Sequence, residues 1–542
     1  MNKIKSFILK YRLHLLALLF IFLIFCVKAY LKHIFYLDFG DEDDNFLLGK
    51  YLLDGKKLYA DMFSQHQPMT YILSASFQFI THPQNIFLLV KRHREFMIVW
   101  SVTWGLFLTF RYGSPLFLTV IIFELSKIYL LGGLFLAESL VAYPLIYIVS
   151  YLYTKSKIYP SYAGLQPKGL SKQLRGSYTR ANLFASGINI SLEFLFISLL
   201  LPFVFFNLLP LWPLLGFIYL YFLFKAKNKV GVGMILALGF LSAVLLVSRF
   251  ISIKDYLYDT IYMNYKYFLP LTKDYSGQFT PIKAFIAPLI ALFDTKSTPL
   301  LWIIKSASLL LIINFYFLLR NKKYQTVFLT ILILGLAGIR YVEPHELMYR
   351  AFHMLPWFSL LILITFLLTL RNYKELKDRR YKIGLFGFLL LIFAVTFYQA
   401  KVDLFNKTDT ATDYYIHFSS HEDYIAAIKI LSNNTDTLFV APFANYLYWN
   451  TGVKQYSSYI AFPRAMEKIP FMANDITKKF QTDPPTFLWL DDNKSMFLKY
   501  IDRYKVLKKD NYPTKLYINL KKIPQITKDQ LEKLKFYRFS FD

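Results

Sequence analysis

Long apolar blocks separated by short polar connections dominate residues 1–400 of the chain. A helix needs ~20 apolar residues to cross the hydrocarbon core of a bilayer, and blocks of that order recur along this part of the sequence. They lie at residues 13–31, 96–110, 115–131, 133–153, 183–206, 208–224, 231–247, 300–319, 327–341, 351–370 and 383–400. The hydropathy pattern therefore predicts about eleven transmembrane helices. No small-residue cleavage pattern follows the first block, so we expect a retained helix rather than a signal peptide.

The pattern changes at residue 401, where polar residues become frequent and the apolar runs shorten. Helical and strand-like segments then alternate, which is typical of a small α/β domain. We expect helices at residues 422–431, 464–480, 495–503 and 528–534, and strands at residues 437–441, 486–490 and 515–520. The predicted fold is a polytopic α-helical membrane protein, residues 1–400, followed by an extracytoplasmic α/β domain, residues 401–542. The second part is long enough to bury its own core.

Basic residues indicate the orientation of the helices. Lysines and arginines precede the first block and gather in alternate connections, at residues 155–180, 225–229, 320–323 and 371–382. Connections rich in Lys and Arg stay on the cytoplasmic side. With the N-terminus inside and an odd number of spans, the first long loop, residues 32–95, and the C-terminal domain are both expected outside.

Composition narrows the class of protein further. Hydrophobic residues make up 56% of the chain and charged residues only 18%, which excludes an ordinary soluble protein. The net charge of +27 would suggest nucleic acid as the partner of a soluble domain. Here much of that charge lies in the basic connections, so we expect contact with membrane lipids and no nucleic-acid binding. Cys26 is the only cysteine, which excludes an intrachain disulfide and disfavours a cysteine zinc site.

The first outer loop begins with four consecutive acids, Asp41, Glu42, Asp43 and Asp44. Carboxylates this close repel one another, so at least one should have a raised pKa unless a cation lies near. A carboxylate tuned in this way can take a proton from a hydroxyl nucleophile. The alternative is a solvated acidic loop without chemistry.

The acids belong to a longer motif. Asp41-Glu42 is followed by the stretch that ends at Gly55, by Leu58-Tyr59-Ala60-Asp61, and by His66-Gln67-Pro68. This order resembles the first loop of the C-type (GT-C) glycosyltransferases. It is most similar to the dolichyl-phosphate-mannose protein mannosyltransferase-like group and its bacterial lipid-A aminoarabinose transferase relatives. The chain departs from them at Gln67, where relatives often have Pro, and in the extra acids Asp43 and Asp44.

The resemblance implies transfer of a sugar from a polyprenyl-phosphate donor to a hydroxyl of a glycan, lipid or protein, at the outer face of the membrane. Asp41 would be the base, with Glu42 beside it, and His66 would lie near the donor phosphate. Many members of the group need no metal. A divalent cation such as Mg²⁺ or Mn²⁺ at Asp41, Glu42 and Asp43 remains a second possibility, since clustered oxygens suit these ions.

Further candidates lie on the same predicted outer face. Glu343, His345 and Arg350 follow the block at residues 327–341, and the guanidinium of Arg350 suits bidentate contact with a phosphate. Lys266 stands in a tyrosine-rich connection and is a second candidate for the phosphate. For both segments the alternative is an interfacial anchor of the kind that borders membrane helices.

Charged residues inside predicted spans include Glu138, Glu124 and Lys127. Glu138, near the outer end of its span, is a candidate for the substrate cavity. Glu124 and Lys127 are three residues apart in one span. Intramembrane charges often mark functional sites, but this spacing puts both on one helix face, and we expect them to pair there.

Two other functions fit a chain of this type. A transporter or lipid flippase would carry its ionisable residues at the midplane, often in repeated halves. No repeated halves are visible, and the acids cluster at one surface. An envelope scaffold whose outer domain binds a partner is the other alternative. The single cysteine and the lack of a eukaryotic retention signal favour a bacterial inner membrane.

Overall fold

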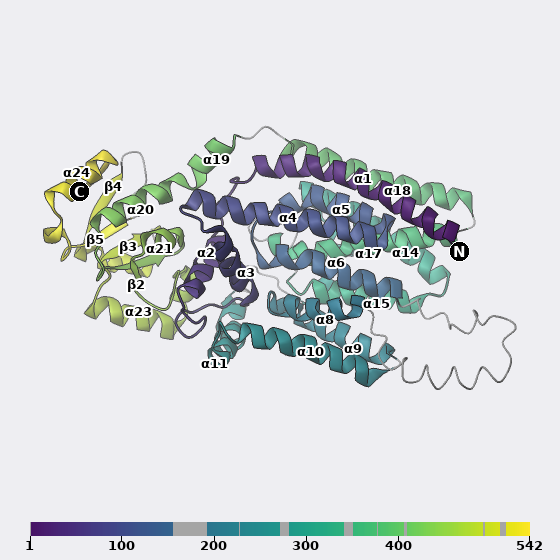
Figure 1. The fold of residues 1–542 in the computed structure, drawn as a ribbon, viewed down its shortest axis with the longest axis horizontal. Helices are drawn as coiled ribbons and strands as arrows, with labels where there is room; N and C mark the ends of the chain where they lie inside the picture. Colours follow the sequence, from purple (N-terminus) through teal and green to yellow (C-terminus); the bar gives the residue numbers. More distant parts are fainter. Residues whose placement is uncertain are drawn as a thin grey trace.

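The computed structural model describes residues 2–155, 192–226, 228–271, 281–340, 351–376, 378–405, 409–491, 494–509 and 516–541. Figure 1 shows a body of long helices with a small sheet domain at one end, and the N-terminus at the opposite end. Two short helices, α2 (Gly40–Leu53) and α3 (Met69–Thr81), lie between the helical body and the sheet domain.

The helical body contains the apolar blocks predicted from hydropathy. It is built from α1 (Asn2–Lys32), α4 (Ile86–Tyr112), α5 (Ser114–Ser126), η1 (Lys127–Leu130), α6 (Ala137–Lys155), α8 (Leu192–Phe205), η4 (Leu209–Leu211), α9 (Trp212–Lys225), α10 (Lys229–Val247), α13 (Pro281–Phe293), α14 (Pro299–Arg320), α15 (Tyr324–Ala337), η6 (Phe352–Met354), α17 (Leu355–Glu375) and α18 (Arg379–Asp403). The beginning of the block at residues 183–206 and the end of the block at residues 327–341 lie outside the described residues.

The predicted count of about eleven spans is not confirmed. Within the described residues, five helices are long and apolar enough to cross a membrane: Tyr11–Lys32, Lys229–Val247, Pro299–Arg320, Phe352–Glu375 and Arg379–Lys401. Several other apolar blocks form shorter helices, among them Leu192–Phe205, Leu209–Lys225 and Tyr324–Ala337. The block at residues 115–131, for example, leaves the α-helix at Ser126, continues as η1 and turns at Leu131, which has a φ of 53°.

Burial separates inner from outer helices. The apolar window of the span Phe352–Glu375 is 83% buried, whereas that of Lys229–Val247 is only 22% buried. Large apolar side chains of α10 therefore remain exposed, among them Met234, Leu238 and Leu241. An apolar surface of this extent is stable in lipid and not in water. The chain is a membrane-embedded multi-pass protein.

The sheet domain has one six-stranded sheet. Its strands are β1 (Thr437–Ala441), β2 (Lys454–Gln455), β3 (Phe487–Leu490), β4 (Tyr504–Lys509), β5 (Leu516–Asn519) and β6 (Phe539–Phe541), in the order β2-β1-β3-β5-β4-β6. β1 pairs in parallel with β2 and β3, and the remaining pairs are antiparallel. Its helices are α19 (Thr410–His417), α20 (Ser419–Leu431), α21 (Tyr446–Thr451), α22 (Arg464–Glu467), α23 (Pro470–Thr482), η7 (Met496–Arg503), η8 (Ile523–Gln525) and α24 (Lys528–Phe536).

Most of the elements predicted for this domain are confirmed, and β1 has the predicted bounds. The single helix predicted at residues 464–480 is wrong, because Pro470 starts a new helix and separates α22 from α23. The segment at residues 495–503 forms a 3₁₀-helix. β4 and β6 were not predicted. The three lysines of β4 obscure the alternation of apolar and polar residues that indicates a strand. β6 is too short to show such an alternation.

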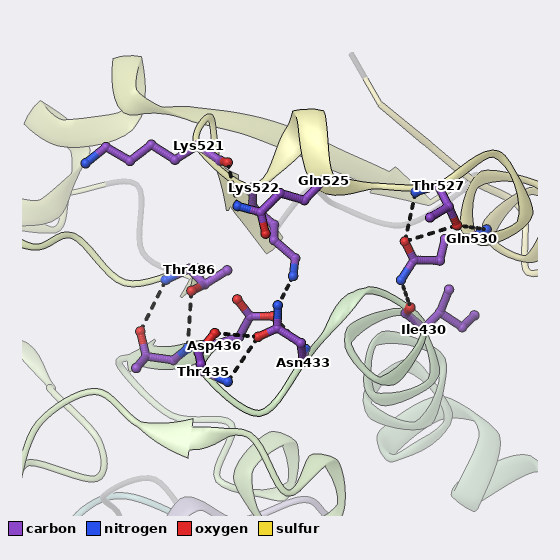
Figure 2. Close-up of polar contacts among 11 residues, drawn as sticks. Ile430, Asn433, Thr435, Asp436, Thr486, Lys521, Lys522, Gln525, Thr527 and Gln530 are labelled. Carbon is purple, nitrogen blue, oxygen red and sulfur yellow. Dashed lines mark hydrogen bonds and ion pairs between the residues drawn. The ribbon is translucent and has the colours of Figure 1, made fainter.

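A buried ion pair ties the end of the chain to β1. Lys522 Nζ lies 2.7 Å from Asp436 Oδ2, and the same oxygen accepts a hydrogen bond from the Asn433 backbone N–H. Figure 2 shows this pair beside the capping box of α24, where Thr527 and Gln530 bond each other's backbone N–H groups. Gln530 also donates to the carbonyl of Ile430 at 2.6 Å, which holds α24 against α20.

The sheet domain packs directly on the first loop. One hydrophobic core contains Phe46 of α2, Tyr71 of α3, and Tyr424 and Leu447 of the sheet domain. Polar contacts cross the same boundary: Trp449 Nε1 donates to Gln78 Oε1 at 2.9 Å, and the Phe63 N–H donates to the Ser458 carbonyl at 2.9 Å. Because they share a core, the loop and the sheet domain lie at the same end of the helical body.

Candidate functional site

The acidic motif forms the first turn of α2. Phe39, in an extended conformation, directly precedes the helix. The Phe39 carbonyl accepts hydrogen bonds from the backbone N–H groups of Glu42 and Asp43. No side chain caps this end. Acids in the first turn are favoured there because they interact with the free N–H groups and the positive end of the helix dipole. Successive residues of a helix point about 100° apart, so the acids face different surroundings.

Glycines set the position of α2. A Cβ on Gly49 would lie 2.8 Å from Ser74 Cβ and 2.9 Å from the Ala75 backbone nitrogen, so only glycine allows α2 to lie this close to α3. Gly55, with a φ of 84°, lies just after the end of α2 and turns the chain in the left-handed region. Both glycines belong to the motif on which the family resemblance rests.

Glu42 lies in a fully buried ion pair. Its carboxylate accepts hydrogen bonds from Arg94 Nε and Nη2 and, at 2.8 Å, from the Phe135 backbone N–H. Arg94 also donates to the carbonyls of Ile34 and Leu37. Glu42 has no exposed surface. The pair fastens the acidic turn to α4 and to the segment before α6, and both Glu42 oxygens are occupied by these bonds.

Asp43 and Asp44 meet the sheet domain through Asn445. The Asn445 backbone N–H donates to Asp43 Oδ2 at 3.1 Å, and Asn445 Nδ2 donates to Asp43 Oδ1 at 3.2 Å and to Asp44 Oδ1. Burial raises the pKa of both acids, and the charge of Asp41 adds to the effect on Asp44, whose pKa reaches about 8. Crowding of the acids predicts a raised pKa in this cluster; here burial is the main cause and the neighbouring charges add to it.

Asp41 faces a different group of residues. It is partly exposed, and its charge acts on Arg340, in the turn after α15, and on His353 of η6. His66 is likewise partly exposed, and it interacts electrostatically with Glu138 and His353. The loop that carries His66 is held by the Tyr59 hydroxyl, which donates to the His66 carbonyl at 2.7 Å.

Arg340, His353 and Glu138 form a hydrogen-bonded chain beside Asp41. His353 Nε2 lies 2.9 Å from Arg340 Nη2, and His353 Nδ1 lies 3.0 Å from Glu138 Oε1. A guanidinium can only donate, so Nε2 accepts and the ring proton sits on Nδ1, where it donates to Glu138. The imidazole is therefore neutral in this arrangement. Within the described residues, the bond to His353 is the one hydrogen bond of the Arg340 guanidinium, which has further N–H groups that can donate to a partner such as an anion.

The sequence identified part of this group. Glu138 was predicted and lies in it. Glu343, His345 and Arg350 lie outside the described residues. Arg340 and His353 were not singled out, although both are ionisable residues at the ends of apolar blocks. The cost of burying charge in a membrane makes such residues functional candidates, and that signal was available in the sequence.

Lys266 lies on the π-helix η5 (Leu257–Phe268), where its contacts are with tyrosines. Nζ donates to the Tyr262 hydroxyl at 2.6 Å and lies over the rings of Tyr262 and Tyr267. No contact in the described part of the chain joins Lys266 to Asp41 or His66. This environment matches the interfacial-anchor interpretation better than a phosphate site.

The pair predicted within one span is confirmed. Lys127 Nζ lies 2.8 Å from Glu124 Oε2 and also donates to Ser101 Oγ at 2.7 Å. Tyr143 donates to the same Glu124 carboxylate. These contacts balance the buried charge within the helical body and leave this pair with a structural role.

Metal binding stays a prediction. Over the described ranges, no three His, Cys, Asp or Glu side chains come together as a group that could hold an ion. The choice between no metal and a divalent cation such as Mg²⁺ or Mn²⁺ is therefore one for experiment.

A comparison of the chain with protein-family models finds no match, and neither does a comparison with curated proteins. Function must therefore be argued from the chemistry of the residues that meet at the acidic turn.

Proposed function

We propose that the chain is a membrane glycosyltransferase that moves a sugar from a polyprenyl-phosphate donor to an acceptor hydroxyl. The observation that carries the proposal is the Arg340–His353–Glu138 chain of hydrogen bonds next to the turn that carries Asp41. Glu42, the residue after Asp41, accepts a bond from the N–H of Phe135, which is close in sequence to Glu138. Glycosyl transfer of this kind needs a base for the incoming hydroxyl and a cation for the departing phosphate. Asp41 and Arg340 supply these two groups.

The reaction is a single displacement at the anomeric carbon. Asp41 takes the proton of the acceptor hydroxyl, and the oxygen forms a bond to the anomeric carbon. The bond between that carbon and the phosphate oxygen breaks, and its electron pair stays on the lipid phosphate. Attack from the face opposite to the phosphate inverts the configuration of the sugar.

Arg340 is the proposed partner of the leaving phosphate. A guanidinium offers paired donors that suit two phosphate oxygens. His353 accepts one N–H of Arg340 and so holds the plane of the guanidinium, while Glu138 fixes the ring proton on Nδ1. His66 can donate a ring N–H to the same phosphate.

Glu42 has a positioning role in this proposal. Its oxygens are engaged with Arg94 and the Phe135 N–H, so a proton from the acceptor has no free site on Glu42. The family resemblance of residues 41–68 and the basic connections together favour an outward-facing site, with the sheet domain outside a bacterial inner membrane. A glycan, a lipid or a protein can supply the acceptor hydroxyl.

The test is transfer by the purified full chain in detergent. We expect release of lipid phosphate from a polyprenyl-phosphate sugar when an acceptor is present, and loss of at least ~10²-fold in turnover for Asp41→Asn, because the amide cannot take the hydroxyl proton. Asp54→Asn is the matched control, since Asp54 is an exposed acid at the other end of α2. Turnover with a UDP- or GDP-sugar and no lipid carrier would defeat the proposal. Movement of an intact lipid across vesicles without chemistry would support the flippase instead.

A further inference from the structure

Asn445 of the sheet domain forms hydrogen bonds to two acids of the acidic turn, Asp43 and Asp44. It has no exposed surface, and it bonds residues that are about four hundred positions away in the chain, 402 for Asp43 and 401 for Asp44. Three hydrogen bonds join it to these acids, one from its backbone N–H and two from its side-chain Nδ2. An amide group that donates to two neighbouring carboxyl groups at once holds both in a fixed geometry.

The surroundings of Asn445 hold it rigidly. Asn445 directly precedes α21, whose next residue, Tyr446, packs its ring 6.3 Å from that of Phe46. Farther along α21, Trp449 is bonded to Gln78. Phe443, on the other side of Asn445, lies where a Cβ on Gly40 would be 3.3 Å from its ring. The segment on both sides of Asn445 is therefore fixed against α2 and α3.

The charges around the two acids are mostly negative. Asp43 interacts electrostatically with Asp38 and Asp44, and Asp44 with Asp41, while Tyr71 and Tyr446 nearby are neutral because burial raises their pKa values. Amide donors stabilise a carboxylate but do not cancel its charge. The raised pKa of Asp44, about 8, means that this pair retains a proton at neutral pH. That proton reduces the negative charge next to Asp41.

We propose that Asn445 is a positioning residue through which the sheet domain sets the geometry and charge of the turn that carries Asp41. The inference rests on the proposed glycosyl transfer and extends it: the sheet domain is part of the active site and not a separate binding module. Asn445 touches neither donor nor acceptor and acts through Asp43 and Asp44.

Kinetics of the purified full chain test this directly. Asn445→Ala removes two bonds to charged groups, and we expect kcat to fall about tenfold to a hundredfold with KM for the lipid donor unchanged. Asn450→Ala is the matched control, because Asn450 lies on α21, the helix that Asn445 directly precedes, and among the described residues its side chain accepts one exposed bond, from Lys429. A kcat equal to that of the control, or a loss confined to KM, would overturn the proposal.

The pH profile separates positioning from general loss of packing. The Asn445 bonds favour the ionised acids, so their removal raises the pKa of the pair and moves the limb of the pH–rate profile that it controls to higher pH. The isosteric Asn445→Asp keeps the shape, removes the donor and adds a third acid, so its shift should be larger. If Asn445→Ala fails to fold, Asn445→Asp carries the test. A profile that does not move in the folded variant refutes the proposal.

A measurement without substrate keeps the two proposals apart. Infrared difference spectra of the full chain, titrated with acid and base, report protonated carboxyl groups, and Asp44→Asn identifies the signal of the pair. Asn445→Ala should raise the midpoint of that signal, and an unchanged midpoint would overturn the role of Asn445. If the midpoint rises but the protein transfers no sugar, the role of Asn445 in setting the pKa of the two acids stands. Only the glycosyltransferase proposal is then defeated.

Discussion

Two groups of residues at the acidic turn use the same chemistry in opposite ways. Glu42 and Arg94 form a pair whose side chains are 0% and 3% exposed, and every contact described for them is internal. Glu138, His353 and Arg340 also join a carboxylate to a guanidinium, but the His353 side chain is 19% exposed and Arg340 is partly exposed. Asp41, one residue before Glu42, faces this second group.

The difference lies in how many donors and acceptors are already used. A saturated buried pair is fixed in place and has no capacity to bind a ligand, whereas a partly exposed guanidinium with spare N–H groups can bind an anion. Neighbouring acids of one motif therefore have separate roles, Glu42 in holding the turn and Asp41 in the proposed chemistry. The variants below change one group at a time, from the largest expected effect to the smallest.

Breaking the saturated pair should have the largest effect, on stability. Arg94→Leu leaves the Glu42 charge buried without its partner, and we expect a loss of about 3–5 kcal/mol in the free energy of unfolding. Chemical denaturation of the protein in detergent measures it. Arg92→Leu is the control, since Arg92 is an exposed residue of the same helix that pairs with Glu95. Equal stability of the two variants would contradict the structural role assigned to Glu42.

Changing the partly exposed group of Glu138, His353 and Arg340 should affect turnover and leave stability nearly unchanged. Arg340→Gln removes the cation proposed to stabilise the leaving phosphate, which is expected to lower kcat by about 10²-fold. Arg340→Lys should recover part of the rate, because it keeps the charge and loses the paired donors. Arg111→Gln serves as control, since Arg111 pairs with Glu193 elsewhere in the helical body. If Arg340→Gln lost stability while its folded fraction kept normal turnover, Arg340 would have a structural role and not the proposed catalytic one.

The pH dependence of stability tests the role of Asp44, which belongs to neither of these two groups. Asp44 has a pKa of about 8 in the folded protein, against 3.8 as its ordinary value, so the folded state binds more protons between these values. The stability linked to Asp44 is therefore present at low pH and is lost as pH rises through about 8. Asp44→Asn cannot ionise, and we expect it to be more stable than wild type at pH values above that point. Thermal unfolding at a pH near 3.8 and at a pH above about 8 gives the test, because the two proteins should diverge across this range. A parallel pH response in the two proteins would contradict it.

The smallest effect is expected at Lys266. Its contacts are with tyrosines of its own helix, so Lys266→Ala should change turnover by less than about twofold. The same assay as for Arg340→Gln measures it, with the lipid donor varied. A loss of turnover comparable to that caused by Arg340→Gln would instead indicate that Lys266 acts with Arg340 on the donor phosphate.

The membrane character and many of the helix positions follow from the sequence alone. Long apolar blocks must form helices in lipid, because no water satisfies their backbone groups there. The number of spans does not follow in the same way, since breaks such as the one at Ser126 leave some helices short. In the sheet domain, strands with apolar residues at every position, such as β3, were predictable, and β4, with its three lysines, was not.

The sequence by itself identified the acidic turn and Glu138, because unusual charge density at a membrane helix is visible without a fold. Only the tertiary structure distinguished Glu42 from Asp41, since adjacent residues of a helix face different partners. It also brought Arg340, His353 and Asn445 to the turn. These residues lie hundreds of positions from Asp41, and such meetings depend on how the helices and the sheet domain pack, which no local pattern of residues records.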